Sequence, residues 1–227
     1  TTNEDQDIVI NLSGSDVDGD ALTFTTGTPS NGSVTIDGNI ATYTPDADYN
    51  GDDSFTFTVS DGDLSDSATV TLTIDSVNDA PILTAVSDVA FNEDTSTSIS
   101  VSGSDVDGDA LTFSITGGSE IAATLDGSDI AFTASENFNG SETFTITTTD
   151  SQLIDSQNIT VTVNAVNDAP VATTGLSGTT NEDQSIVINL SATDVDGDVL
   201  IFNLDSDSMN GAVTIDGNIA TYIPDAN

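Results

Sequence analysis

The sequence predicts an all-β protein built as a tandem array of β-sandwich units. Short acidic motifs recur every 89 residues, which is the pattern of one structural unit repeated along a chain. Between the motifs, apolar and polar residues alternate over short runs, as in strands with one buried face. Asp/Gly turn clusters separate the runs, and no helical period is present. The recurring motifs are NED at 3–5, 92–94 and 181–183, DVDGD at 16–20, 105–109 and 194–198, and VNDAP at 77–81 and 166–170.

The first repeat shows how strands fill one period of about seven strands. Phe55, Phe57 and Val59 alternate with polar residues in one run, and a hairpin with its turn at Asp37-Gly38 precedes them. A single further strand is expected at 82–91, where the next repeat begins. This spacing is typical of an all-β sandwich. The expected strands of the first repeat lie at 8–12, 21–25, 34–36, 40–44, 54–60 and 68–74.

The period divides the chain into three repeats, at 1–79, 80–168 and 169–227. We expect the second repeat to be complete and the first to lack its opening strand. The third repeat carries one extra residue in the loop 204–211 and lacks the runs that match 54–60 and 68–74. The sequence is therefore expected to be an excerpt from a longer array.

The charge balance restricts the possible partners. The 227 residues include 39 Asp and Glu but no Lys, Arg, His or Cys, giving a net charge of −39. Without basic residues the surface cannot neutralise phosphates, so we expect neither nucleic acid nor anionic membrane as a partner. No run approaches the ~18 apolar residues of a membrane-spanning helix. Such dense carboxylates must be neutralised by cations or by separation in salt, and Ca²⁺ is the natural hard cation for oxygen ligands.

The DVDGD loops have a spacing that suits a calcium ion. Asp105 and Asp107 stand two residues apart, and Gly108 lets the loop bend so that both carboxylates converge on one ion. The motif also resembles the start of an EF-hand loop, but no Glu closes it at the twelfth position. Asp and Gly are also good turn residues, so each copy alone is explained by a solvated turn. Three copies, each following an acidic loop one strand earlier, favour the ion.

The order of these pieces resembles that of cadherin-type extracellular repeats. The stretch VNDAPILTAVSDVAFNEDTSTSISVSGSDVDGDALTFSI is similar to a cadherin linker followed by the Glu-bearing and DxD loops. The chain looks most like the bacterial cadherin-like tandem repeats of giant surface adhesins, often secreted with RTX proteins. The resemblance covers the whole chain and implies an Ig-like Greek-key sandwich for each repeat. It also implies an extracellular location, on the cell surface or secreted.

The resemblance implies calcium between consecutive repeats, with ligands from three sources. At the first linker these are Glu4, Asn78, Asp79, Asp105, Asp107 and Asp150, and at the second Glu93, Asn167, Asp168, Asp194 and Asp196. Asp16, Asp18 and Asp61 are the corresponding residues of the first repeat, where we expect an open and weak site. Animal cadherins carry a DRE motif where this chain reads PDADYNGDD, interpreted here as a turn. Fewer ligands imply fewer or weaker ions at each linker.

The resulting functional hypothesis is a calcium-stiffened extender of a bacterial adhesin or surface fibre. Its partners would be calcium, neighbouring repeats and other copies in a fibre. An enzyme is not expected, because His, Lys and Cys are absent and the carboxylates recur with the repeat. The alternative is a polysaccharide-binding module of a secreted protein, with glycans as partners. Trp is absent, and Tyr43, Phe132 and Tyr222 occupy equivalent hairpin positions, which favours packing over sugar binding.

Overall fold

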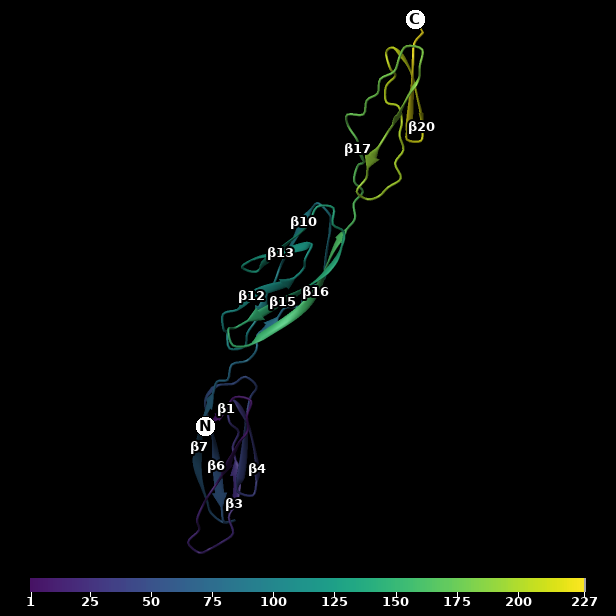
Figure 1. The fold of residues 1–227 in the computed structure, drawn as a ribbon. Coiled ribbons are helices and arrows are strands. Elements are labelled where there is room, and N and C mark those ends of the chain that lie inside the picture. Colours follow the sequence, from purple (N-terminus) through teal and green to yellow (C-terminus); the bar gives the residue numbers. More distant parts are fainter. Residues whose placement is uncertain (227) are drawn as a thin grey trace. The chain divides into compact units, whose positions relative to one another are not determined.

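The computed structural model describes residues 1–226, and every regular element in them is a strand (Figure 1). None of these residues forms a helix of the length and apolarity needed to cross a membrane. The chain divides into two compact units that do not follow the sequence repeats. Unit 1 comprises 1–85, 101–114 and 147–157, and unit 2 comprises 86–100, 115–146 and 158–227. The two VNDAP motifs, called the first linker (77–81) and the second linker (166–170), therefore each lie inside one unit.

In unit 1, the first repeat forms two sheets, whose pairs are antiparallel except for the parallel edge pair β1–β7. One sheet has the order β1-β7-β6-β3 and the other the order β2-β5-β4. Strands β6 and β7 form the longest ladder, from Gly51 opposite Ile74 to Ser60 opposite Ser65. The strands are β1 (Thr2–Asn3), β2 (Ile8–Asn11), β3 (Thr23–Thr26), β4 (Gly32–Asp37), β5 (Ile40–Pro45), β6 (Gly51–Ser60) and β7 (Ser65–Asp75).

The core of this sandwich is formed by the inward residues of both sheets. Ala41 and Tyr43 of β5 are fully buried and belong to one cluster with residues of β6 and β7. Period-two alternation brings such residues to one face of each strand, so two apolar faces close on each other. The other buried members are Leu12, Phe55, Leu72 and Ile74. The alternation that predicted these strands therefore predicted the core as well.

The β4–β5 hairpin differs slightly from the prediction. Asp37 pairs with Ile40, so the two turn residues are Gly38 and Asn39 rather than Asp37 and Gly38. Gly38 has a φ of +61°, a backbone conformation that glycine adopts at little cost. The register places Ile36 opposite Ala41, which keeps the apolar side chains of both strands on one face.

The expected single strand at 82–91 is two separate strands. Strand β8 (Ile82–Leu83) pairs with β11 (Gly103–Ser104) in unit 1, whereas β9 (Val89–Asn92) runs parallel to β16 (Ile154–Asn164) in unit 2. The break between them carries Asp88, whose carboxylate accepts the backbone N–H of Thr160 at 2.7 Å. The short β8–β11 pair also explains why residues 80–168, all of which the structure describes, hold nine strands and not about seven.

In unit 2, a three-stranded sheet of order β10-β14-β13 supplies one face of a core. Phe132 of β14 and Phe144 of β15 are both fully buried, with ring centroids 5.4 Å apart at 74°, an edge-to-face pair. A second sheet has the order β12-β15-β16-β9, and β12, β15 and β16 contribute residues to both units. The strands are β10 (Ser96–Ser100), β12 (Thr112–Gly117), β13 (Ile121–Asp126), β14 (Asp129–Ala134), β15 (Gly140–Thr149) and β16 (Ile154–Asn164).

The rest of unit 2 repeats the hairpin architecture with less burial. Strands β17 (Val171–Ala172) and β19 (Ala192–Thr193) pair with each other, and a sheet has the order β18-β21-β20. Its strands are β18 (Ile186–Asn189), β20 (Gly211–Asp216) and β21 (Ile219–Pro224). Among the described residues after 171, no apolar side chain is fully buried, and Val199 and Met209 are each 93% exposed.

Candidate metal centre

Strand β1 carries Glu4 to the linker. Thr2 and Asn3 pair with Ile74 and Asp75 of β7, and the Glu4 N–H continues the ladder to the Asp75 carbonyl at 3.0 Å. The Glu4 side chain is only 3% exposed, and its carboxylate accepts the backbone N–H of Val77. Edge-strand pairing therefore fixes this carboxylate beside the first residues of the linker.

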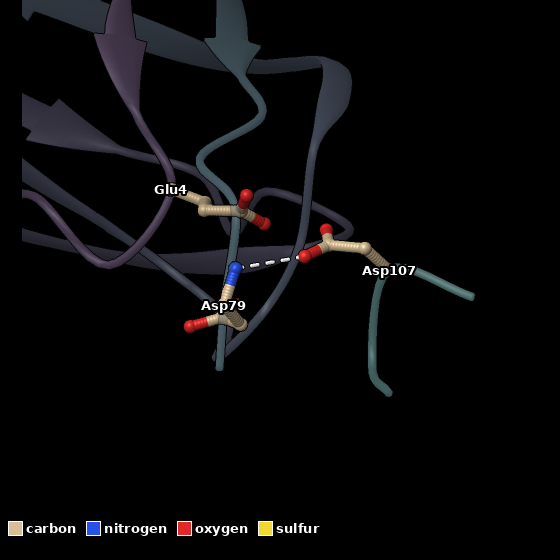
Figure 2. A group of neighbouring side chains, drawn as sticks. All are labelled: Glu4, Asp79 and Asp107. Atoms are coloured by element: carbon tan, nitrogen blue, oxygen red, sulfur yellow. Dashed lines mark hydrogen bonds between the residues drawn. The ribbon is translucent and has the colours of Figure 1, made fainter. Parts of the chain in front are cut away.

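The linker itself is held by the acidic loops of the second repeat. The Asp79 N–H donates to Asp107 Oδ2 at 2.8 Å (Figure 2). The Asn78 side-chain amide donates to Asp150 Oδ2 at 2.8 Å, and its carbonyl oxygen accepts from the Gln152 amide at 2.7 Å. All five residues belong to unit 1. Residues far apart in sequence thus converge on two linker positions.

Two carboxylate triads form around Asp79. Glu4, Asp79 and Asp107 each offer one oxygen within 4.8 Å of the others, and Figure 2 shows the Glu4 and Asp107 carboxylates turned toward each other. Asp5, Asp48 and Asp79 form a second group by the same measure. Oxygens about 2.3–2.6 Å from one Ca²⁺ lie at most about 5 Å apart, so both triads have a spacing that fits this ion.

The electrostatics of the first linker are unfavourable without a cation. Burial raises the pKa of the Asp79 carboxyl above its ordinary value, and the carboxylates of Asp48, Asp107, Glu4 and Asp5 raise this pKa further. Asp79 Oδ2 and Asp105 Oδ2 are buried and accept no hydrogen bond. Because the sequence contains no Lys, Arg or His, no side chain can compensate this charge. The donor set, hard carboxylate oxygens with two unsatisfied atoms, fits Ca²⁺.

Asp150 reaches the linker in a different role from that of the triads. Its Oδ1 accepts the backbone N–H groups of Gln152 and Leu153, both at 2.6 Å, while Oδ2 accepts from Asn78. The hydrogen bond from Asn78, followed by that from Leu153, lowers the pKa of the Asp150 carboxyl. The side chain is 6% exposed. Asp150 therefore positions Asn78 directly.

Inside unit 2, the second linker repeats two hydrogen bonds of the first, but among the described residues it forms no group of three close carboxylates. The buried Glu93 accepts the Val166 N–H at 2.5 Å, and the Asp168 N–H donates to Asp196 Oδ2 at 2.7 Å. Asp168 Oδ2 is buried without a hydrogen-bond partner. Asn167 donates to the carbonyl oxygen of Asp168 at 3.0 Å. Burial raises the pKa of the Asp168 carboxyl, as do the carboxylates of Asp94, Asp196, Glu93 and Asp194.

In the acidic loops at the other end of the first repeat, the Asp side chains accept hydrogen bonds from the backbone of the same loop. Asp16 Oδ1 accepts the N–H groups of Asp18 and Gly19 at 2.8 and 2.7 Å. Asp61 Oδ1 accepts those of Asp63 and Leu64, and the Leu64 bond, the larger of the two effects, lowers the Asp61 pKa. Within residues 1–226, Asp16, Asp18 and Asp61 join no group of three close carboxylates. A weak site there stays a prediction.

The sequence reasoning missed Asp5 and Asp48. Asp48 lies in the PDADYNG segment that was interpreted as a turn, and it does occupy a turn, with a φ of +58°. Its N–H donates to Asp5 Oδ1 at 3.3 Å, which brings the two loops together. The available signal was the period, since Asp94 and Asn137 recur 89 residues later with φ values of +58° and +56°.

The chain matches a family model over most of its length. The model described as bacterial Ig domain matches residues 1–73, 78–162 and 167–227. This protein belongs to the bacterial Ig domain family. No curated protein shows significant similarity to this bacterial Ig protein.

Solved structures extend the comparison. The mouse protocadherin-24 EC1-3 structure is 13% identical, and the match covers 90% of this chain and 77% of that one with a TM-score of 0.51. At that identity the match shows a shared fold. An endo-fucoidan hydrolase from glycoside hydrolase family 107 is 24% identical over 73% of this chain, with a TM-score of 0.32. The bacterial Ig protein spans only 27% of that hydrolase chain.

Proposed function

We propose that this bacterial Ig protein is a calcium-binding structural segment of an extracellular surface protein. The observation that carries the proposal is the convergence of Glu4, Asp79 and Asp107, with Asp79 Oδ2 buried and without a partner. These residues come from the two sides of a linker and from the linker itself. Because the chain has no basic side chain, the balancing charge must come from solution, and a divalent cation such as Ca²⁺ suits a cluster of hard carboxylate oxygens.

The proposed ligands are the acidic and amide side chains that the sequence motifs place at each linker. Glu4, Asp79, Asp105 and Asp107 would hold Ca²⁺ at the first linker, with Asn78 and Asp150 completing or orienting the set. Glu93, Asn167, Asp168, Asp194 and Asp196 would do the same at the second. Binding neutralises carboxylates that otherwise repel each other across the linker. The linker would then be restricted in its motion, which is a mechanical function.

The proposal includes an extracellular location for this function. Extracellular calcium modules bind with dissociation constants of ~10⁻⁴–10⁻³ M, which suits an ion that is abundant outside cells. Repeats at 1–79, 80–168 and 169–227 would act as successive modules of a stalk or fibre. We propose an adhesin of the RTX-secreted type, whose calcium-stiffened repeats hold a distal domain away from the cell surface.

Polysaccharide binding is the alternative that the sequence left open. Sugar sites commonly present exposed aromatic faces, and all 9 Phe and 3 Tyr side chains, which lie within the described residues, are buried or half-buried. Tyr43 and Phe132 are fully buried, as their equivalent hairpin positions predicted. No observation favours a glycan site, so the mechanical function is preferred.

Thermal unfolding tests the proposal. For a dissociation constant of about 10⁻⁴ M, about 10 mM free Ca²⁺ adds about 2.7 kcal/mol per site to the free energy of unfolding. Melting curves in Ca²⁺ and in EDTA, at constant Mg²⁺ and ionic strength, should differ by several degrees. Coincident curves in the two buffers would refute calcium binding at the linkers.

A further inference from the structure

The third repeat contains two segments that correspond to strands of the earlier repeats but do not form strands. Residues 180–181 correspond to β1 and residues 201–204 to β3. In the first repeat these two strands flank a central pair in a sheet of order β1-β7-β6-β3, and in the second repeat the order is β12-β15-β16-β9. Within residues 169–226, no strand takes the place of the central pair. The third repeat therefore presents two backbone edges where the complete repeats have a hairpin.

The same gap leaves the apolar side of the sheet β18-β21-β20 open. In the first repeat, Ala41 and Tyr43 are fully buried, because β6 and β7 supply apolar side chains to the same cluster. The corresponding residues of β21, Ala220 and Tyr222, are only half-buried. An open apolar face in so highly charged a chain is typical of an interaction site, since covering it removes apolar surface from water.

A pocket of about 380 Å³ lies in the third repeat where the complete repeats contact their central strands. Ala172 and Phe202 are part of its lining. Phe24, which corresponds to Phe202, lies against Phe57 of β6 with ring centroids 6.4 Å apart. Leu83, which corresponds to Ala172, donates its backbone N–H to a carboxylate of β16 at 2.8 Å. The two complete repeats thus show which kind of segment covers these positions.

We propose that the open face of the third repeat is a binding site for a β-hairpin of another bacterial Ig repeat, with the chemistry of β6–β7. Such a hairpin carries apolar side chains at alternate positions and Ser or Thr between them. It would lie between residues 180–181 and 201–204, where backbone pairing on both edges provides affinity and the alternate apolar side chains provide specificity. The inference goes beyond the proposed calcium function and does not depend on it.

A synthetic peptide of residues 50–75 is the probe, because the first and third repeats share the sequences TTNEDQ and VTIDGNIATY. Binding of this peptide to the whole chain is measured by isothermal titration calorimetry at constant calcium and 0.15 M salt, which screens the charges of both partners. We expect one peptide to bind per chain. Hydrogen exchange should slow in the segments that contain 180–181 and 201–204, and should stay unchanged in β3, which is already paired.

Two matched pairs of variants locate the site. In the chain, Phe202→Ser should weaken binding by at least about tenfold, because the apolar ring is lost from the open face. Ile201→Thr should leave binding unchanged, because Ile201 is 81% exposed and the first repeat has Thr at this position. In the peptide, Phe55→Ser should weaken binding comparably and Thr56→Ser should not, since Phe55 is buried in the first repeat and Thr56 is exposed.

The peptide variants keep the test decisive even if Phe202→Ser unfolds the third repeat. If wild type binds no peptide, or if Phe55→Ser and Thr56→Ser peptides bind equally well, the inference is overturned. Dimers of the chain alone that Phe202→Ser abolishes and the peptide does not displace would assign the face to a second copy, which also overturns it. Each of these results leaves calcium binding at the linkers untouched.

Discussion

At the scale of single residues, Asp61 and Asp150 show how one motif takes two roles. They are equivalent in the 89-residue period, and each Oδ1 caps the same kind of turn. Only Asp150 also accepts a bond from a linker residue, Asn78, through its Oδ2. The turn is a local property of the motif. The linker bond exists because a preceding repeat delivers Asn78.

We predict that Asp150→Asn reduces the calcium-dependent rise in melting temperature and that Asp61→Asn leaves it nearly unchanged. At residue 150 an Asn can still cap the turn, but its NH₂ group then faces the NH₂ group of Asn78, which costs about 1–3 kcal/mol. Calcium titrations and melting curves of both variants check this.

The DVDGD loops contain a second pair of equivalent residues, Asp107 and Asp18, of which only Asp107 contacts the linker. Asp107 accepts the Asp79 N–H, whereas Asp18 contacts no linker residue in the described structure. Asp107→Asn should therefore behave like Asp150→Asn, and Asp18→Asn like Asp61→Asn. Equal losses in all four variants would show that calcium responds to bulk acidity and would contradict the linker site.

At the scale of elements, one carboxylate fastens the β-hairpin of each of the first two repeats to the strand that follows it. In the first repeat, Asp53 accepts from the N–H of Ser30 and Asn31 and from the Tyr43 hydroxyl. In the second repeat the residue equivalent to Tyr43 is a Phe, which has no hydroxyl. There the longer Glu142 accepts the N–H groups of Ser119, Glu120 and Ile121 instead.

These bonds give the hairpin anchor a defined pH dependence. The hydroxyl of Ser119, followed by the backbone N–H groups, lowers the pKa of Glu142 from 4.5 to about 2. A carboxyl whose pKa is lower in the folded than in the unfolded state stabilises the protein at pH values above its unfolded-state pKa. This stabilisation is lost as the pH falls through the folded-state pKa. The contribution of Glu142 is therefore fully present above about pH 5 and disappears between about pH 4.5 and 2.

We predict that Glu142→Gln lowers the free energy of unfolding by about 1–3 kcal/mol at pH 7, through the loss of charge-assisted hydrogen bonds. The difference from wild type should shrink toward zero as the pH approaches 2. Glu120→Gln is the matched control, because this exposed side chain lies in the same segment and only its backbone N–H takes part. A difference from wild type that is constant between pH 7 and 2 would contradict the assigned role.

At the scale of the whole molecule, charge is the dominant property. A net charge of −39 without any basic residue leaves the carboxylates of each linker to repel one another at low salt. At both proposed calcium sites this repulsion is visible, because neighbouring carboxylates raise the pKa of Asp79 and of Asp168. Calcium would therefore act on the linkers more than on the sandwich cores.

We predict that small-angle scattering shows a longer and stiffer particle in millimolar Ca²⁺ than in EDTA at the same ionic strength. The physical reason is that one ion held by residues on both sides of a linker removes its hinge freedom. Asp107→Asn should reduce the change, and Asp18→Asn should not. Identical scattering profiles with and without calcium would count against a mechanical role.

Much of this architecture follows from the sequence. The period of 89 residues and the alternation of Phe55, Phe57 and Val59 predicted sandwich units and their buried faces, because both are local, repeated patterns. The all-β sandwich prediction is confirmed by the sheets and by the family to which the chain belongs. The single strand expected at 82–91 was wrong, because its two halves find partners in β11 and β16, which lie far away in sequence.

For the candidate site, too, the sequence determined one part and the tertiary structure the other. The sequence by itself determined that Glu4, Asp79 and Asp107 belong to recurring acidic motifs, and that a chain without basic residues needs a cation from solution. Only the tertiary structure decided that Asp48 joins Asp5 and Asp79, while Asp150 is engaged in holding Asn78. The physical reason is that a carboxylate becomes a ligand or a cap through neighbours supplied by distant strands, and spacing along one loop does not specify those neighbours.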